Sequence, residues 1–139
     1  MKNIDLVETS AEGERAERQL VVAAVIETPQ GILLCRRPED GTDPGKWELP
    51  GGKVEPGETF RHALSRELWE ELRVKGEIGG TITKIRIGHT ELIFLKASLP
   101  EPFEPSLHHF KEVAFVPRDE LKRYDLLEAD RRFLLAEEK

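Results

Sequence analysis

Three glutamates in the middle of the chain have a spacing that suits a divalent metal ion. Glu67, Glu70 and Glu71 lie at i, i+3 and i+4, so a helix would place their carboxylates on neighbouring positions. Like charges at this spacing destabilise an isolated helix by roughly a few tenths of a kcal/mol. A bound cation would remove that repulsion, and carboxylate oxygens suit Mg²⁺ or Mn²⁺. The alternative is a solvated acidic face in which Arg66 pairs with Glu70.

The segment that carries these glutamates is expected to be a helix. No Gly or Pro interrupts the chain from Thr59 to Arg73. An apolar residue recurs at every fourth position and forms one stripe: Phe60, Leu64, Leu68 and Leu72. Thr59 can cap the helix, and Glu58 lies where the helix dipole favours a negative charge. Upstream, Gly51-Gly52 can supply a carbonyl ligand and let the backbone approach a phosphate.

The register of these residues resembles the Nudix box, G-x5-E-x7-R-E-U-x-E-E-x-G-U, in which U is aliphatic. The matching residues are Gly52, Glu58, Arg66, Glu67, Glu70 and Glu71. One position departs from the box, because Arg73 stands where it has Gly. Arg73 must either accept a left-handed conformation, at a cost of about 1 kcal/mol, or let the helix run on towards Gly76. Both changes lie beyond the glutamates, so we expect the chemistry to be kept.

The resemblance implies a role for each matched residue. Glu67, Glu70 and Glu71 would bind Mg²⁺, which Mn²⁺ can replace, with the carbonyl of Gly51 as a further ligand. Arg66 would belong to the catalytic group because it orients the glutamates. Glu58 would contact the metal ligands or bound water from outside the coordination shell. Further residues implied to contact substrate are Arg37 and Lys53, which would face the phosphates, and Leu49 and Asp130.

The general base is left open by the sequence. Glu70 or Glu71 can serve, as can a downstream acid such as Glu112 or Glu104. His108-His109 is a further pair suited to acid–base work. Adjacent residues of an extended strand point to opposite faces, so both histidines cannot serve one site there, and a loop or edge position is favoured.

The small domain, the run Trp47–Lys53 and the stretch from Leu127 to Asp130 resemble the MutT-like branch, which hydrolyses nucleoside triphosphates to monophosphate and pyrophosphate. A carboxylate at Asp130 could accept a hydrogen bond from the exocyclic amine of cytosine or adenine. The alternative for Asp130 is an ordinary helix N-cap. Rival functions are hydrolysis of ADP-ribose, a nucleotide sugar or a dinucleoside polyphosphate, or a non-catalytic nucleotide sensor. Residues that mark the ADP-ribose and dinucleoside polyphosphate relatives are replaced here by Thr90 and Glu91.

The remaining pattern predicts a single α+β domain over residues 1–139, with 1–17 as a flexible N-terminal extension. The expected order is β-β-α-β-β-β-α, and the resemblance to the Nudix family implies a mixed β-sheet sandwiched between helices. Hairpins are expected between Leu20–Ile26 and Ile32–Cys35, and between Thr81–Ile87 and Thr90–Ala97. A short strand follows at Glu112–Val116. Helices are then expected at Asp119–Tyr124 and Ala129–Glu138, and loops at Pro38–Lys46, Lys53–Gly57 and Pro100–Pro105.

Composition restricts the partners and the compartment. The net charge is −6, which argues against a general affinity for nucleic acid or anionic membranes. Cys35 is the only cysteine, which excludes an intrachain disulfide and a cysteine-rich zinc site. The first fifteen residues lack the apolar core of a signal peptide, and we therefore expect a cytoplasmic monomer or homodimer acting on a small nucleotide.

Overall fold

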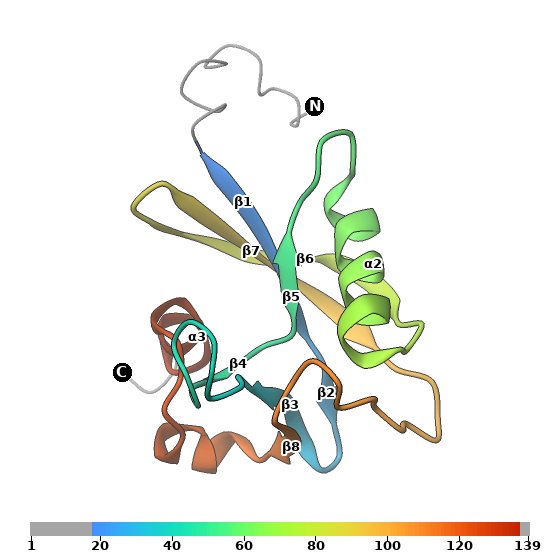
Figure 1. The fold of residues 1–139 in the computed structure, drawn as a ribbon, viewed down its shortest axis with the longest axis vertical. Coiled ribbons are helices and arrows are strands. Elements are labelled where there is room, and N and C mark those ends of the chain that lie inside the picture. Colours follow the sequence, from blue (N-terminus) through green and yellow to red (C-terminus); the bar gives the residue numbers. More distant parts are fainter. Residues whose placement is uncertain (1–17, 137–139) are drawn as a thin grey trace.

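The computed structural model describes residues 18–136, which form two β-sheets flanked by helices (Figure 1). The strands are β1 (Gln19–Val25), β2 (Glu27–Thr28), β3 (Gly31–Arg36), β4 (Trp47–Glu48), β5 (Gly51–Lys53), β6 (Glu77–Ile87), β7 (Thr90–Ser98) and β8 (Glu112–Val116). The helices are α2 (Phe60–Leu72), the 3-10 helix η2 (Arg118–Arg123) and α3 (Glu128–Leu134). The expected N-terminal extension lies outside the described residues.

The first sheet is mixed, as the sequence predicts. Its order is β5-β1-β7-β6, with β1 antiparallel to β5 and parallel to β7. β6 and β7 form the predicted antiparallel hairpin, which turns at Gly88-His89. Because β5 pairs with β1 as an edge strand, the chain that leads into α2 is fixed to this sheet.

The hairpin predicted between the first two strands is wrong for most of its length. Only the two residues of β2 pair with β3, while β1 pairs with β5 and β7 in the other sheet. The chain crosses from one sheet to the other at Ile26, whose carbonyl accepts the Leu33 amide at 3.0 Å. β3 also pairs with β4 and with β8. The pattern of apolar residues predicted the two strands, but it did not specify their partners.

Strands β1, β3 and β7 are buried on both faces, which explains their almost continuous apolar sequences. On β1, Val22 and Ala24 join a core beneath α2, while Ala23 and Val25 join a core shared with the C-terminal helices. β3 and β7 alternate in the same way. The result is the predicted layering of sheet between helices, with α2 and α3 on opposite sides in Figure 1.

Several boundaries differ from the prediction. The stretch between the two predicted loops, for which no strand is predicted, contains β4 and β5, whose strand pairing satisfies its backbone groups. The segment from Arg118 is a 3-10 helix, and α3 ends at Leu134. The loops predicted at Pro38–Lys46 and Pro100–Pro105 are confirmed. Within residues 18–136, no helix is long and apolar enough to cross a membrane.

Candidate metal-dependent active site

α2 begins and ends where the sequence predicts. The side chain of Thr59 caps it by accepting the His62 amide at 3.0 Å. Arg73 adopts the left-handed conformation, with φ 59° and ψ 40°, and its amide donates to the Trp69 carbonyl at 2.9 Å. Of the two alternatives at Arg73, the first is therefore confirmed. Its guanidinium also lies 5.4 Å from the centre of the Trp69 ring, a cation–π contact that offsets part of the backbone strain.

Arg66 is the centre of a network that fixes the acidic side chains. Its guanidinium donates to Glu58 at 2.6 and 2.9 Å, to Glu67 at 3.1 Å and to Glu70 at 3.1 Å. A further bond at 3.0 Å reaches the carbonyl of Lys53, which ties α2 to β5. Hydrogen bonds from Arg66 and from the Glu55 amide lower the pKa of Glu58 to about 2. Glu58 therefore stays ionised and holds Arg66 in place.

The two glycines before the helix are required for different reasons. A Cβ on Gly51 would lie 1.9 Å from the Val22 carbonyl oxygen, so only glycine permits the pairing of β5 with β1 here. A Cβ on Gly52 would lie 2.4 Å from the carboxyl carbon of Glu67. The space beside Gly52 is thus occupied by one of the predicted metal ligands.

Glu71 is the most deeply buried of the three glutamates. Its side chain is 9% exposed, against 14% for Glu67 and 55% for Glu70. Its Oε1 accepts the Gly51 amide at 3.1 Å. Its Oε2 lies 3.4 Å from Nε2 of His109, which comes from the loop between β7 and β8. The structure thus joins α2, β5 and this loop at one carboxylate.

The electrostatics of these side chains favour a bound cation. Burial, followed by the charges of Glu67 and Glu48, raises the pKa of Glu71 to about 9. Burial also raises the pKa of Glu67, and it raises that of Glu48 to about 7. These carboxylates oppose one another's ionisation, and a divalent ion would remove the penalty. The donor set therefore fits a divalent metal.

The protein groups supply only part of a coordination shell. Across residues 18–136, no three His, Cys, Asp or Glu side chains converge as a complete metal cage. Mg²⁺ commonly binds one or two carboxylates and takes its other ligands from water and substrate phosphates. Glu67, Glu70 and Glu71, with the carbonyl of Gly51, are the groups that would hold such an ion here.

Asp130 is not the helix cap that the alternative interpretation proposed. The N-cap of α3 is Leu127, and Asp130 lies in the first turn, 4% exposed. Its Oδ2 accepts the amide of buried Leu49 at 3.4 Å, which brings these two predicted substrate residues together. Burial and the charge of Glu48 raise the pKa of Asp130 to about 8. At neutral pH the carboxyl therefore carries a proton and can both donate and accept.

The other predicted residues lie further from this centre or have protein partners. Arg37 donates to Glu48 at 3.0 Å and to the Thr42 carbonyl at 2.8 Å. The Lys53 side chain is exposed beside β5. Glu112 on β8 pairs with Arg36 at 3.1 Å, and Glu104 is exposed on the loop between β7 and β8. The structure thus does not group either downstream acid with Glu71.

Comparison with known proteins identifies the family. The sequence profile of the NUDIX domain matches residues 17–136. This chain belongs to the Nudix family. It is 38% identical over 113 residues to the CTP pyrophosphohydrolase of Escherichia coli K12, covering 79% of this chain and 84% of that protein. It is 33% identical over 133 residues to the nucleoside triphosphatase NudI of an Enterobacter species, covering 82% and 92%.

Solved structures agree with the sequence matches. The solution structure of the E. coli ORF135 protein superimposes with a TM-score of 0.69 at 32% identity, covering 88% of this chain and 89% of that one. The predicted α+β Nudix fold is therefore confirmed, and the protein is a Nudix hydrolase. Nudix hydrolases generally use a divalent metal, which agrees with the carboxylates on α2.

Two residues that the sequence does not assign lie near Glu71 in the structure. Glu48 ends β4, shortly before β5, and its charge raises the pKa of both Glu71 and Asp130. The sequence offers His109 only as one of a pair in a loop, and its contact with Glu71 spans 38 residues of sequence. No spacing rule links these positions. For Glu48, its place in the run Trp47–Lys53 is the only available signal.

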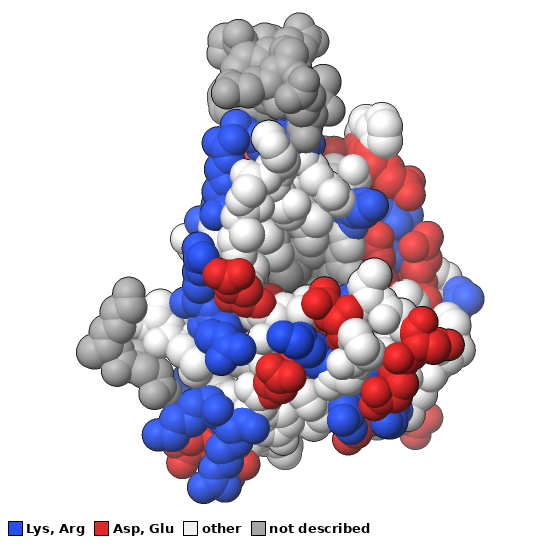
Figure 2. All heavy atoms as spheres, turned by 60° about the vertical axis from the view of Figure 1, so that its left-hand side comes forward, with Lys and Arg blue, Asp and Glu red and all other residues white. Residues whose placement is uncertain are grey.

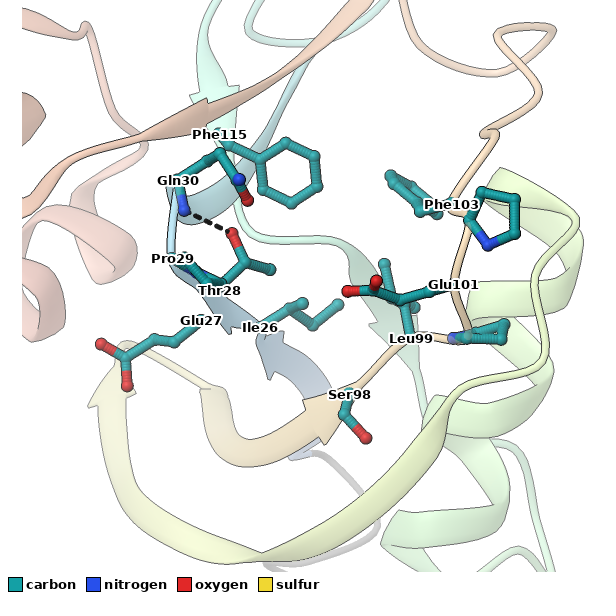
Figure 3. A pocket seen from close by; sticks show the side chains of 12 residues that line it. Ile26, Glu27, Thr28, Pro29, Gln30, Ser98, Leu99, Glu101, Phe103 and Phe115 are labelled. Carbon is teal, nitrogen blue, oxygen red and sulfur yellow. Dashed lines mark hydrogen bonds between the residues drawn. The ribbon is translucent and has the colours of Figure 1, made fainter.

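The surface of the Nudix domain has a hollow on the face that Figure 2 brings forward. Basic and acidic side chains both lie along its lower margin in this view. A separate pocket of about 370 Å³ lies between the β2–β3 turn and the loop after β7. Figure 3 shows its apolar side chains, Ile26, Leu99, Phe103 and Phe115, beside Glu27 and Glu101. No predicted site residue lines this pocket, so we do not assign the reaction to it.

Gly52→Ala tests whether the position of the Glu67 carboxylate matters to the Nudix reaction. The added Cβ would displace that carboxylate, so we expect the hydrolysis rate to fall roughly 10- to 100-fold. The flexible side chain can move aside, so the free energy of unfolding should fall by less than about 2 kcal/mol. Gly41→Ala is the control, because a Cβ there meets nothing within 4 Å. An unchanged rate in Gly52→Ala would refute the assignment of Glu67.

Proposed function

We propose that this Nudix hydrolase uses Mg²⁺, which Mn²⁺ can replace, to hydrolyse a nucleoside triphosphate to the monophosphate and pyrophosphate. The observation that carries the proposal is the buried Glu71 carboxylate, held by the Gly51 amide beside Glu67. Two relatives that match most of this chain are named for nucleoside triphosphate hydrolysis, which supports the substrate class.

The metal would supply positive charge that neutralises the diphosphate and helps to ionise the attacking water. The chain's own residues would position the reacting groups. Arg66 keeps Glu67 and Glu70 in fixed orientations, and Glu58 keeps Arg66 in place. The proton of the attacking water would pass to Glu70 or Glu71. Glu112 is a weaker candidate for this base, because it lies on β8, where it pairs with Arg36, and not on α2 with the other glutamates.

Asp130 is proposed to recognise the nucleotide base. A protonated carboxyl presents one donor and one acceptor side by side. Cytosine offers a ring-nitrogen acceptor next to its amino donor, and adenine offers the same pair, so both are complementary to it. The name of the E. coli relative favours the cytosine nucleotide. CTP and dCTP are therefore the first substrates to test.

A substrate panel with Mg²⁺ tests this proposal. Normal and damaged nucleoside triphosphates, ADP-ribose, a nucleotide sugar and a dinucleoside polyphosphate would be compared, with pyrophosphate and phosphate release measured separately. We expect pyrophosphate release from triphosphates, fastest with a cytosine base. Asp130→Ala should reduce kcat/KM for the preferred base by roughly 10- to 100-fold and change it less for the other bases.

The panel also separates the rival functions. Turnover of ADP-ribose, a nucleotide sugar or a dinucleoside polyphosphate without triphosphate turnover would establish a different Nudix hydrolase. Binding of a nucleotide without any turnover would establish a sensor. We propose that the enzyme works in the cytoplasm as a monomer or homodimer, and the net charge of −6 supports a small nucleotide rather than nucleic acid as its partner.

A further inference from the structure

His109 lies against the most buried carboxylate of the site. Its Nε2 is 3.4 Å from Oε2 of Glu71, whereas Oε1 of the same carboxylate accepts the Gly51 amide at 3.1 Å. The imidazole therefore faces the oxygen that the Gly51 amide does not bind. The loop between β7 and β8 thus contributes a nitrogen donor next to the glutamates of α2.

The loop that carries His109 is anchored on both sides. The Ser106 amide donates to the Leu72 carbonyl at the end of α2 at 3.0 Å, and the Lys111 amide donates to the Arg36 carbonyl at 2.9 Å. Phe110 is only 3% exposed and inserts into the core beneath α2. The His109 ring packs edge-on against it, with centroids 4.8 Å apart. These contacts hold the imidazole close to Glu71.

The separation of the two side chains, 3.4 Å, is longer than an ordinary hydrogen bond and is compatible with a shared ion. A hydrogen bond between a protonated imidazole and a carboxylate would bring the atoms to about 2.7–2.9 Å. Two adjacent donors of an octahedral ion, each about 2.1 Å from it, lie about 3 Å apart. The observed 3.4 Å requires only a small closure to reach that separation.

We propose that His109 Nε2 is a metal ligand that binds the same divalent ion as Glu71 Oε2. The proposal rests on the proposed function only in placing a metal at Glu71. It has a consequence for the choice of metal. Carboxylate and water suit Mg²⁺, whereas an imidazole strengthens binding of first-row transition ions much more than binding of Mg²⁺. This chain should therefore favour Mn²⁺ over Mg²⁺ at that site.

His108 provides a matched control within the same loop. Its Nδ1 lies 2.9 Å from the Ser106 hydroxyl, so its ring is engaged by its own loop, and the side chain is exposed. His108→Ala and His109→Ala each remove one imidazole from adjacent positions. His109→Gln adds a further test, because glutamine can still donate a hydrogen bond to Glu71 but lacks the imidazole nitrogen.

The experiment measures Mn²⁺ binding to the full chain. Electron paramagnetic resonance would detect the coupling between bound Mn²⁺ and a nitrogen that coordinates it directly. Titrations would give the Kd for Mn²⁺ and for Mg²⁺. We expect nitrogen coupling in the wild type and in His108→Ala, and its loss in both His109 variants. The Kd for Mn²⁺ should rise roughly tenfold or more in the His109 variants, while that for Mg²⁺ changes about threefold or less.

The outcomes distinguish this inference from the proposed function. Absence of nitrogen coupling in the wild type, or its persistence in His109→Ala, would overturn the ligand assignment, whatever the hydrolysis rates. Loss of Mn²⁺ affinity in His109→Ala but not in His109→Gln would also overturn it, because His109 would then only position Glu71. If the coupling is found but the panel shows no triphosphate turnover, the ligand assignment stands and the proposed function fails. Circular dichroism would verify that each variant is folded.

Discussion

Glu71→Gln should reduce triphosphate hydrolysis roughly 100- to 1,000-fold at saturating Mg²⁺, measured as pyrophosphate release. The substitution keeps the shape of the side chain and its acceptor oxygen for the Gly51 amide. It removes the negative charge that would bind the ion. Because the fold is expected to be unaffected, the loss should be mainly in kcat and in metal affinity.

The same variant should alter the pH dependence of stability in the metal-free protein. Burial and neighbouring charges raise the pKa of Glu71 from 4.5 to about 9 in the folded chain. A raised pKa contributes stability that is fully present below the unfolded value, near 4.5, and is lost as pH rises through the folded value. Glutamine has no proton to lose. The fall in Tm between about pH 5 and about pH 8 should therefore be smaller in Glu71→Gln than in the wild type.

Added metal provides a second measurement on the same proteins. A divalent ion that binds ionised Glu71 should raise the Tm of the wild type more at about pH 8 than at about pH 5. Glu71→Gln should show little of this increase. Glu77→Gln is the control, because Glu77 is exposed at the start of β6. Full hydrolysis by Glu71→Gln, or an unchanged pH dependence of its Tm, would refute the role given to Glu71.

Arg66→Lys should lower hydrolysis roughly 10- to 100-fold despite keeping the positive charge. The guanidinium binds Glu58, Glu67, Glu70 and the Lys53 carbonyl at once, and the three hydrogens of an ammonium cannot reproduce this geometry. Because Arg66 acts through the glutamates, metal affinity should weaken together with the rate. The measurements are kcat, KM and the activation constant for Mg²⁺.

Arg61→Lys is the matched control for this prediction, since Arg61 is exposed on the same helix. It should change neither the rate nor the activation by Mg²⁺ by more than about twofold. A rate in Arg66→Lys equal to that of the wild type would show that charge alone suffices. If kcat falls while the activation constant for Mg²⁺ stays unchanged, Arg66 does not act by orienting the metal ligands.

The sequence predicts α2 and the grouping of its acidic side chains well, because the information for both is local. Spacing along one helix determines which side chains share a face, so Glu67, Glu70, Glu71 and Arg66 can be grouped from their spacing alone. Thr59 as the cap follows from the same local rules. The left-handed Arg73 is one of two alternatives, and the sequence does not choose between them.

Strand pairing is predicted less well. The apolar runs identify β1 and β3, yet β1 pairs in parallel with β7, about seventy residues away, instead of forming a long hairpin with β3. A strand that is buried on both faces has apolar residues on both of them. Its sequence therefore carries little information about which strands pair with it. Register with β5 depends on the close approach of Gly51 to Val22, which no spacing rule shows.

The sequence by itself determined the family, the glutamate-bearing helix and the class of chemistry, since these depend on residue types at fixed local intervals. Only the tertiary structure distinguished among the glutamates. It buries Glu71 beside Gly51, leaves Glu70 half exposed, and brings Glu48 and His109 to the same site. Burial and distance set the proton affinity of a carboxylate, and both arise from contacts between segments far apart in the chain.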